Sequence, residues 1–287
     1  MNREETIEKN MLPTISTIAR GPINFCRMAL FSALRHTGSS ISGAEQLILL
    51  YHDVAPEPEP RLTCVSVSRF RQHLNVITNI ALRSSGANGD KPSVLVTFDD
   101  ACRGVLEWAA DPIEEAGVSA QVFVVGRWSS RGRAGFTEGT RGLLVNQRKR
   151  CLVSTEIRSL RRRGFRFGAH GWSHSRLTHL DPERLRRELV ASRRWLEDVL
   201  GESVEDFAYP YGDFNRHVIE AVREAGFTTA YTTVNGFRGP SVDALAVPRM
   251  YVHESCSPPE LAAMFQRWYP DYTSLRERVK AHIRLEL

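Results

Sequence analysis

The sequence predicts an α/β protein in which parallel strands are joined by helical crossovers. Short apolar segments of strand length alternate with amphipathic segments of helix length about seven times between residues 46 and 270. Polar side chains suited to chemistry follow the carboxyl ends of several strands, an arrangement that suits the rim of a barrel. The periodicity also fits an open doubly wound sheet, so it leaves both architectures open. The length of 287 residues is within the range of one large domain.

Each expected element rests on an apolar pattern and on residues that start or stop it. Strands are expected at 47–51, 94–98, 120–125, 228–234 and 246–252, with shorter ones at 165–167 and near 207. Helices are expected at 68–82, 103–116, 155–163, 182–200, 215–225 and 257–268. Capping residues mark three helix starts and glycines mark four helix ends: Ser68, Asp181 and Asn215, and then Gly117, Gly164, Gly201 and Gly226.

The chain divides into an extension, one main domain and a tail. Residues 1–45 form an N-terminal extension expected to be partly helical, 46–270 form the main α/β domain, and 271–287 form a charged tail. The apolar run from Ile23 to Leu34 is interrupted by Arg27 and is too short to span a bilayer. As a helix it would lie on a membrane surface or pack against the main domain, and packing is the favoured interpretation.

Charges at the start of the chain and the cysteine pattern bear on the compartment. The first residues carry Glu4, Glu5 and Glu8, unlike the basic start of a secretory signal. Five cysteines are scattered without a CxxC pair: Cys26, Cys64, Cys102, Cys151 and Cys256. These features predict reduced thiols in a cytoplasmic protein, with contact at the inner face of the membrane as a further expectation.

Basic residues are concentrated in one span, residues 127–150, within a chain of net charge +5. Glu138 is its one acid, and its basic residues are Arg127, Arg131, Arg133, Arg141, Arg148, Lys149 and Arg150. The span is expected to form a long loop inserted in the main domain, and long ordered loops are usually functional or mobile. It matches no nucleic-acid recognition motif, so no nucleic-acid partner is expected. No strand precedes a glycine-rich phosphate fingerprint, which disfavours a dinucleotide enzyme.

A buried strand that ends in two adjacent carboxylates is the first candidate site. The segment Val94–Phe98 is rich in β-branched and other apolar residues, and Asp99 and Asp100 follow it directly. Charge at the edge of a core is costly unless it is paired, so a metal or a catalytic task would explain the acids. The alternative is that an aspartate merely caps the helix that follows.

Two histidines at metal-ligand spacing follow another short strand. His170 and His174 are four residues apart, a spacing at which both can bind one ion. The zinc-protease motif requires Glu after the first His, where this chain has Gly171, so that motif is excluded. Two histidines and one carboxylate form a common open site for catalytic zinc, which favours a metal over a structural role.

Three segments together resemble one known family. Thr97–Asp100, His170–His174 and Tyr209–Gly212 resemble, in order and spacing, the first three motifs of polysaccharide deacetylases, the NodB homology domain of carbohydrate esterase family 4. Leu47–Val54 resembles the opening strand of bacterial members, and the resemblance covers roughly residues 47–265. It implies an irregular (β/α) barrel of about seven units, and hence a catalytic domain over residues 46–270.

The resemblance also implies a role for each matching residue. Three residues would hold a divalent metal, with zinc as the expected ion: Asp100, His170 and His174. Asp99 would be the general base that takes a proton from water. The backbone N–H of Tyr211, beside Pro210, would stabilise the oxyanion at the substrate-binding site.

The chain departs from the family pattern at several positions. Ala208 stands where members often have an arginine that steadies the base, and Arg249 on the last expected strand is the proposed replacement at the substrate site. The general acid of the family is a late histidine, for which His253 is the candidate and His52 the reserve. The Asp-Trp pair of the fourth motif is not visible.

These implications give a leading function and two alternatives. The leading expectation is a metal-dependent hydrolase that removes N-acetyl groups from an amino sugar, with an N-acetylated glycan or glycan precursor as substrate. A deformylase acting on a formamido sugar carried by a lipid phosphate would use the same centre, and the basic span would suit the phosphate. A non-catalytic glycan-binding protein on the same fold is the alternative of a different class. The three ligands and the base argue against it.

Overall fold

The computed structural model describes residues 40–41, 44–57, 63–83, 93–132 and 150–274. The expected helix at 23–34, most of the basic span and most of the charged tail lie outside these residues. In the described part of the chain, no helix is both long and apolar enough to cross a membrane.

Strands and helices alternate through the main domain in the expected order. The strands are β1 (Gln46–Tyr51), β2 (Asp53–Ala55), β3 (Cys64–Ser66), β4 (Ser93–Phe98), β5 (Ser119–Val124), β6 (Arg166–Ala169), β7 (Asp206–Ala208), β8 (Thr229–Tyr231) and β9 (Met250–Tyr251). The α-helices are α2 (Val67–Arg83), α3 (Ala110–Ala116), α4 (Gly126–Ser129), α5 (Ser154–Arg162), α6 (Pro182–Leu200), α7 (Arg216–Glu224) and α8 (Pro258–Ala263). Short helical turns of other types are η1 (Val105–Ala109), η4 (Leu177–His179) and η5 (Pro210–Gly212).

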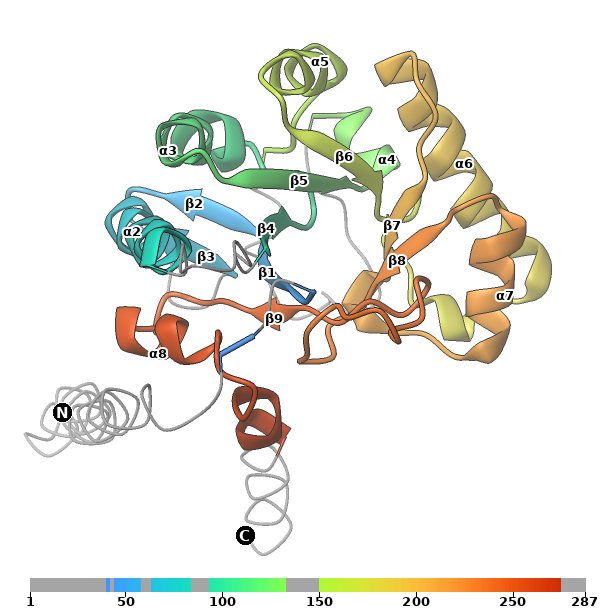
Figure 1. Ribbon diagram of the computed structural model, residues 1–287. Helices are drawn as coiled ribbons and strands as arrows, with labels where there is room; N and C mark the ends of the chain where they lie inside the picture. The colour runs from blue at the N-terminus through green and yellow to red at the C-terminus, as the bar shows by residue number, and fades with distance from the viewer. Residues whose placement is uncertain (1–39, 42–43, 58–62, 84–92, 133–149, 275–287) are drawn as a thin grey trace, which may run out of the picture.

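Seven strands form one parallel sheet that curls into an irregular half-barrel (Figure 1). The strand order is β8-β7-β6-β5-β4-β1-β9. β1 and β4 pair along their whole length, from Gln46 opposite Ser93 to Tyr51 opposite Phe98, so their carboxyl ends lie at the same level. Helices α2, α3, α5, α6 and α7 cover the outer face of the sheet (Figure 1). The expected α/β barrel fold is therefore confirmed.

The chain that follows β8 closes the gap between the two edges of the sheet. Val247 bridges Tyr231 of β8 in parallel, and three residues later Met250 pairs with Leu49 of β1. One short segment thus contacts both edges of the sheet. Because it crosses from one strand to the other, it cannot follow a single regular ladder.

This crossing corrects two of the expected strands. The strand expected at 246–252 is regular only at Met250–Tyr251, and the strand expected at 228–234 is regular only at Thr229–Tyr231. The helix expected at 257–268 is also shorter, because α8 ends at Ala263. Apolar patterning marks these segments as buried, but it does not show that they bend between neighbours.

Apolar side chains of the sheet belong to two separate cores. Successive residues of a strand face opposite sides, so β1 directs Leu47, Leu49 and Tyr51 outward against the helices. The inward-facing positions form a smaller cluster inside the barrel: Ile48, Leu95, Phe123, Ala208, Tyr231 and Val247. Each of these residues comes from a different strand or from the closing segment, so the interior is filled by side chains.

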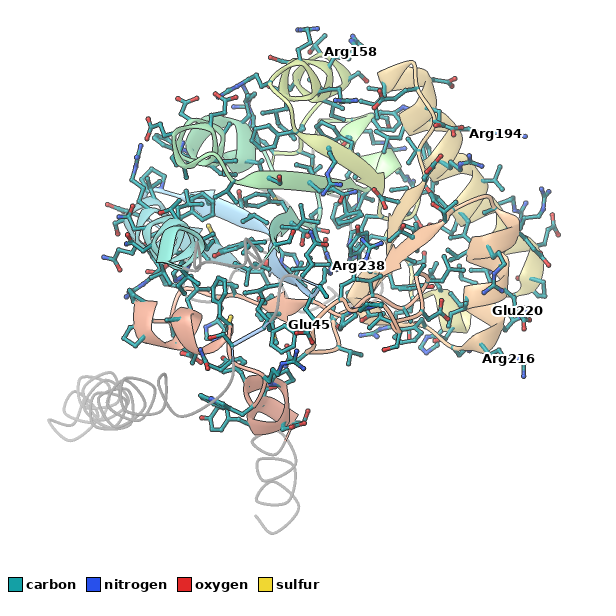
Figure 2. All side chains as sticks on the ribbon, viewed as in Figure 1. Glu45, Arg158, Arg194, Arg216, Glu220 and Arg238 are labelled. Carbon is teal, nitrogen blue, oxygen red and sulfur yellow. The ribbon has the colours of Figure 1, made fainter. Side chains whose placement is uncertain are left out.

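The helix signals in the sequence are confirmed on α6 and α7. Asp181 caps α6 by accepting the N–H of Arg184, and Asn215 caps α7 by accepting the N–H of Val218. The expected apolar stripe of α6 is buried: Leu185, Leu189, Leu196 and Val199. Figure 2 shows that Arg194 of the same helix points away from the barrel, as the opposite face of an amphipathic helix should.

The expected cap of α2 is wrong by two residues. Ser66 rather than Ser68 caps the helix, because Ser66 Oγ accepts the N–H of Arg69 at 3.2 Å. The carboxylate of Glu254 accepts the N–H of Ser66 at 2.7 Å and its hydroxyl at 3.0 Å. The choice of cap thus depends on a residue from the far end of the domain.

Gly168 of β6 has no room for a side chain, and we expect Gly168→Ala to destabilise the protein. A Cβ atom there would lie 2.5 Å and 2.7 Å from ring atoms of Phe123 and 2.8 Å from the carbonyl oxygen of Asp206. Overpacking of this kind costs about 1–3 kcal/mol of unfolding free energy. Denaturant unfolding measures the loss.

Gly239→Ala is the matched control, because its added Cβ would meet only Glu45, at 3.9 Å. Its unfolding free energy should stay within about 0.5 kcal/mol of the unmodified protein. Equal unfolding midpoints for both variants would contradict a rigid barrel interior at Gly168.

Candidate metal centre

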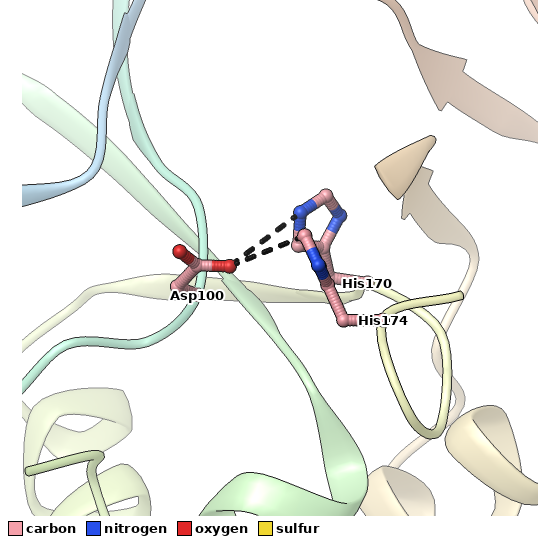
Figure 3. Close-up of side chains that lie close together, drawn as sticks. All are labelled: Asp100, His170 and His174. Atoms are coloured by element: carbon pink, nitrogen blue, oxygen red, sulfur yellow. Dashed lines mark ion pairs between the residues drawn. The ribbon is translucent and has the colours of Figure 1, made fainter. Parts of the chain in front are cut away.

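The three expected ligands converge at the carboxyl ends of β4 and β6 (Figure 3). One ligand atom each from Asp100, His170 and His174 lies within 4.8 Å of the other two. Asp100 Oδ1 is 3.4 Å from His174 Nε2 and 3.9 Å from His170 Nε2. Such a cluster brings one carboxylate and two imidazoles close enough to share one ion.

Neighbouring groups orient both imidazole rings. His170 Nδ1 lies 2.8 Å from the carbonyl oxygen of Ala208, so Nδ1 donates there and Nε2 remains directed at Asp100. The ring of His174 contacts the rings of Trp128 and Tyr211, with centroids at 5.0 Å and 4.5 Å. Ala208, which replaces the arginine expected from the family, therefore contributes through its backbone.

Left-handed backbone conformations are concentrated at this centre. In the described part of the chain, the non-glycine residues with positive φ are Asp100 (72°), Ala101 (50°), His174 (61°) and Tyr211 (61°). Each such residue costs on the order of 1–3 kcal/mol and persists only when surrounding contacts hold it. Two of the four are expected ligands, so the strain has a direct use in aiming side chains at one point.

Glu188 of α6 holds the loop between the two histidines. Its Oε2 accepts the N–H of Trp172 at 3.0 Å and the N–H of Ser173 at 2.8 Å, and its Oε1 accepts the Ser173 hydroxyl at 2.6 Å. One carboxylate thus satisfies three donors between His170 and His174. The loop is fixed to a long helix rather than left to its own short turns.

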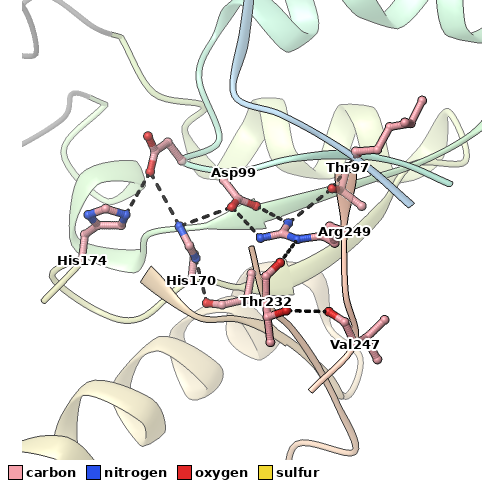
Figure 4. A network of polar contacts seen from close by, with 10 residues as sticks. Thr97, Asp99, His170, His174, Thr232, Val247 and Arg249 are labelled. Carbon is pink, nitrogen blue, oxygen red and sulfur yellow. Dashed lines mark hydrogen bonds and ion pairs between the residues drawn. The ribbon is translucent and has the colours of Figure 1, made fainter. Parts of the chain in front are cut away.

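Asp99 and Arg249 form a buried, two-pronged ion pair beside the three ligands (Figure 4). Arg249 Nη1 and Nη2 each donate to one oxygen of Asp99 at 2.8 Å. The guanidinium also donates to the carbonyl oxygen of Thr232 at 2.9 Å and to Thr97 Oγ1 at 3.3 Å. Arg249 is 0% exposed and Asp99 is 2% exposed, so the pair is removed from water.

The surroundings set the charge state of two groups. Burial would raise the pKa of Asp99, but the charges of Arg249 and His170 and the hydrogen bonds from Arg249 outweigh burial and lower the pKa to about 2. Burial lowers the pKa of His174 to about 4, against the opposing effect of the Asp100 charge. At pH 7 Asp99 is therefore ionised and His174 is a neutral imidazole.

These residues fit a divalent metal. A ligand histidine must be neutral to offer its lone pair, and His174 meets that condition well above pH 4. His170 already has the backbone partner that metal-bound histidines usually have. Among the residues that the structure describes, three protein ligands converge, so positions would remain for water and substrate.

The expected substrate-site residues of the third motif lie at the same rim. Pro210 is buried and starts η5, and Tyr211 follows it with its ring against His174. The guanidinium of Arg176 lies 4.4 Å above the ring of Tyr211, and Arg176 is exposed. Flat side chains thus contact one another in a series that runs from the buried Trp128 through His174 and Tyr211 to the exposed Arg176.

The two candidates for the general acid lie on neighbouring strands. His253 follows β9, and its Nδ1 is 2.7 Å from the Ser255 hydroxyl. His52 follows β1, and its charge is near enough to affect the pKa values of Asp99 and His174. The ring of Tyr251 contacts both histidines, with centroids 5.8 Å from His52 and 5.9 Å from His253.

Three contributors escape sequence reasoning. Trp128 belongs to a helix that forms in the basic span where only a loop is expected, and Arg176 lies just beyond the second motif. Glu188 lies on a helix that the sequence predicts, but the burial of Ser192, four residues later on the same face, is visible only in the structure. None of the three residues therefore carries a sequence signal for its role.

The fold and the centre together define a (β/α) barrel protein with a His-His-Asp cluster at the carboxyl ends of its strands. The family model for polysaccharide deacetylase matches residues 86–230, which is just over half of the chain. The chain belongs to the polysaccharide deacetylase family, whose members are hydrolases that act on amide C–N bonds.

Known relatives agree with this assignment. The Bacillus subtilis (strain 168) protein YxkH, which carries the name of a polysaccharide deacetylase, is 23% identical over 170 residues, or 58% of this chain. The match spans 55% of YxkH, about half of its length.

Solved structures share the fold. The Streptococcus pyogenes deacetylase PplD, solved in complex with acetate, has a TM-score of 0.63 and 18% identity, covering 79% of this chain and 100% of that one. IcaB from Ammonifex degensii has a TM-score of 0.60 and 22% identity with the same two coverages.

Glu188→Ala should weaken metal binding, because the loop between the histidines loses the acceptor of two backbone N–H groups. We expect the dissociation constant for zinc to rise about tenfold or more, and Glu188→Gln to have a smaller effect. Competition with a chromogenic chelator measures the affinity.

Glu197→Ala is the control on the same helix, since Glu197 also accepts a backbone N–H, that of Val204, at 3.1 Å. It should lower stability and leave zinc affinity unchanged. If both alanine variants bind zinc like the unmodified protein, Glu188 has no part in positioning the ligands.

Proposed function

We propose that the protein is a metal-dependent hydrolase that removes N-acetyl groups from an amino sugar in a glycan or glycan precursor. The observation that carries this proposal is the closeness of a three-ligand cluster to an ionised carboxylate held by a buried arginine. A structural metal would not need the second acid, and a simple ion pair would not need the histidines. Family membership supplies the substrate class, an acetylated saccharide.

We infer that Asp100, His170 and His174 hold the ion and that zinc is the ion bound. The donor set of two imidazoles and one carboxylate suits zinc in an open site. When bound, such an ion supplies Lewis-acid activation of water and of the acetamide carbonyl.

Asp99 would accept the proton of the attacking water. Its Oδ2 is 3.8 Å from His170 Nε2, so the acid lies beside the ligand cluster, and both of its oxygens already accept hydrogen bonds from Arg249. Arg249 keeps Asp99 ionised and fixes its plane through two hydrogen bonds. A carboxylate that is ionised and immobile before the reaction needs no reorganisation when the proton moves.

The substrate carbonyl would lie between the centre and the third motif. The N–H of Tyr211 is the proposed donor to the oxyanion, because the left-handed backbone at Tyr211 gives its peptide groups an unusual direction. Pro210 makes this turn rigid, and Arg249 acts on the substrate only through Asp99. The exposed Arg176, whose guanidinium stacks on Tyr211, is a cation that could meet a polar group of the sugar.

The family match favours the deacetylase over the two alternatives. A formamido substrate on a lipid phosphate would need the basic span, most of which lies outside the described residues. A non-catalytic glycan-binding protein would not need an ionised Asp99.

Release of acetate or formate from matched N-acetyl and N-formyl saccharides separates the two reactions. If zinc-loaded protein releases neither product, a binding protein would be favoured. The expected cytoplasmic location is a prediction for cell fractionation.

Substitutions at the two adjacent acids should separate the base from the ligand. Asp99→Asn keeps the shape and loses the base, so we expect turnover on an N-acetyl saccharide to fall at least about a hundredfold. Zinc affinity should stay within about tenfold, which is about 1.4 kcal/mol. Asp100→Asn should instead lose zinc, because an amide is a poorer ligand than a carboxylate.

Zinc content and turnover are measured for both variants side by side. Loss of zinc in Asp99→Asn with retention in Asp100→Asn would reverse the roles. Mild and equal effects would remove both acids from the mechanism.

Replacement of the general acid should leave turnover nearly unchanged for substrates whose leaving group needs no proton. We propose His253 as the acid, since Ser255 fixes its ring, and expect His253→Asn to lose about a hundredfold or more in turnover on an N-acetyl saccharide. Its turnover of an aryl acetate ester should change little, whereas Asp99→Asn should lose activity on both substrates. The matched variant is His52→Asn. If His52→Asn, and not His253→Asn, loses turnover on the N-acetyl saccharide while keeping turnover on the ester, then His52 is the general acid.

A further inference from the structure

Two cysteines far apart in the sequence lie directly opposite each other beside the metal centre. Cys102 and Cys151 form an isolated antiparallel bridge, and both are thiols. Cys102 is 1% exposed and Cys151 is 2% exposed. The spacing of cysteines along the chain gives no sign of this pairing, which depends on the fold.

The hydrogen bonds around the bridge define its type. The N–H of Leu152 donates to the Ala101 carbonyl at 2.9 Å, and the N–H of Arg103 donates to the Arg150 carbonyl at 2.8 Å. These bonds flank the cysteines instead of joining them, so the two form a non-hydrogen-bonded pair. In such pairs the Cα atoms are about 4.5 Å apart and the side chains are closest. That separation is within the range of roughly 4.4–6.8 Å that a disulfide spans.

The same two segments hold strained backbone at the metal centre. Asp100 and Ala101, which directly precede Cys102, have positive φ values of 72° and 50°. Such conformations persist only where neighbouring contacts determine them. The paired segment at residues 150–152 supplies those contacts, including the bond from Leu152 to Ala101.

Cys151 also connects with the second histidine ligand. It packs in a small buried cluster with Val125 and Trp128, and the ring of Trp128 lies 5.0 Å from that of His174. A covalent link from Cys102 to Cys151 would therefore join the segment that carries Asp100 to the group that supports His174.

We propose that Cys102 and Cys151 are a disulfide site, oxidised when a low-molecular-weight disulfide is available, and that the bond fixes the segment that carries Asp100. The thiolate of one cysteine attacks the small disulfide and releases one small thiol. The other cysteine then attacks this mixed disulfide and releases the second small thiol. The protein loses two protons and two electrons, and the small disulfide is reduced to two thiols. Only the effect on Asp100 rests on the proposed metal centre.

Because both thiols are buried, exchange requires the paired segments to open or takes place while the chain folds. The test therefore uses the full-length protein in two ways, incubated folded with oxidised glutathione and refolded from denaturant with oxidised glutathione. Remaining thiols are trapped at low pH and alkylated, and the protein is digested with trypsin without reductant.

The expected product is a linked pair of tryptic peptides, residues 84–103 and 151–158, lighter than their sum by two hydrogen atoms. Oxidation should raise the melting temperature by at least about 5 °C, because the bond closes a long loop. Cys102→Ala and Cys151→Ala should show no such rise. Cys64→Ala is the matched control, since Cys64 is also buried and its removal leaves the pair intact.

Failure to form the linked peptides in both the folded and the refolding sample would overturn the disulfide. Bonds from Cys102 or Cys151 to Cys26, Cys64 or Cys256 would do the same. These outcomes concern thiols alone, so they do not depend on the proposed hydrolase activity.

Metal retention tests the second half of the proposal. Zinc loss to excess chelator should be slower in the oxidised than in the reduced protein, on the order of threefold to tenfold. In Cys102→Ala the oxidant should make no difference. Equal rates for the oxidised and reduced forms of the unmodified protein would show that the bond does not act on the Asp100 segment.

Discussion

The buried ion pair between Asp99 and Arg249 is the constraint on which the rest of the structure depends. Two charges inside a barrel are costly to remove from water unless the geometry is good and the remaining donors are satisfied. Arg249 meets both conditions, with two bonds to Asp99 and others to Thr232 and Thr97. Its guanidinium also lies 5.4 Å from the ring of Phe123 in the interior cluster. The pair therefore holds the closing segment, which carries Arg249, against the carboxyl end of β4, where Thr97 and Asp99 lie.

Much of the fold could be predicted from the sequence because its signals are local. The caps Asp181 and Asn215 and the buried stripe of α6 depend on residues within a few positions of each other. The acids after β4 and the histidines after β6 could be grouped because parallel strands bring their carboxyl ends to one rim. The choice of barrel over open sheet came from family resemblance, since periodicity is the same in both.

What could not be predicted depends on contacts between distant parts of the chain. Ser66 rather than Ser68 caps α2 because Glu254 binds it. The irregular course of residues 244–252 follows from the two strands it joins. Glu188 holds the loop between the histidines from a position in α6 that is 15 residues beyond Ser173. Arg249 could be proposed as a partner for Asp99 only because members of the family often have an arginine that steadies the base. Its complete burial had no sequence signal.

The separation of Asp99 from Arg249 along the chain also determines when the centre can exist. During synthesis the strand ending in Asp99 and the loop with both histidines leave the ribosome well before residue 249, so the acid first appears without its counter-charge. Until the closing segment arrives, the barrel has an open edge and its interior is accessible to water. The ordered centre is thus a late product of the nascent chain, because Asp99 gains its counter-charge only after residue 249 has been made.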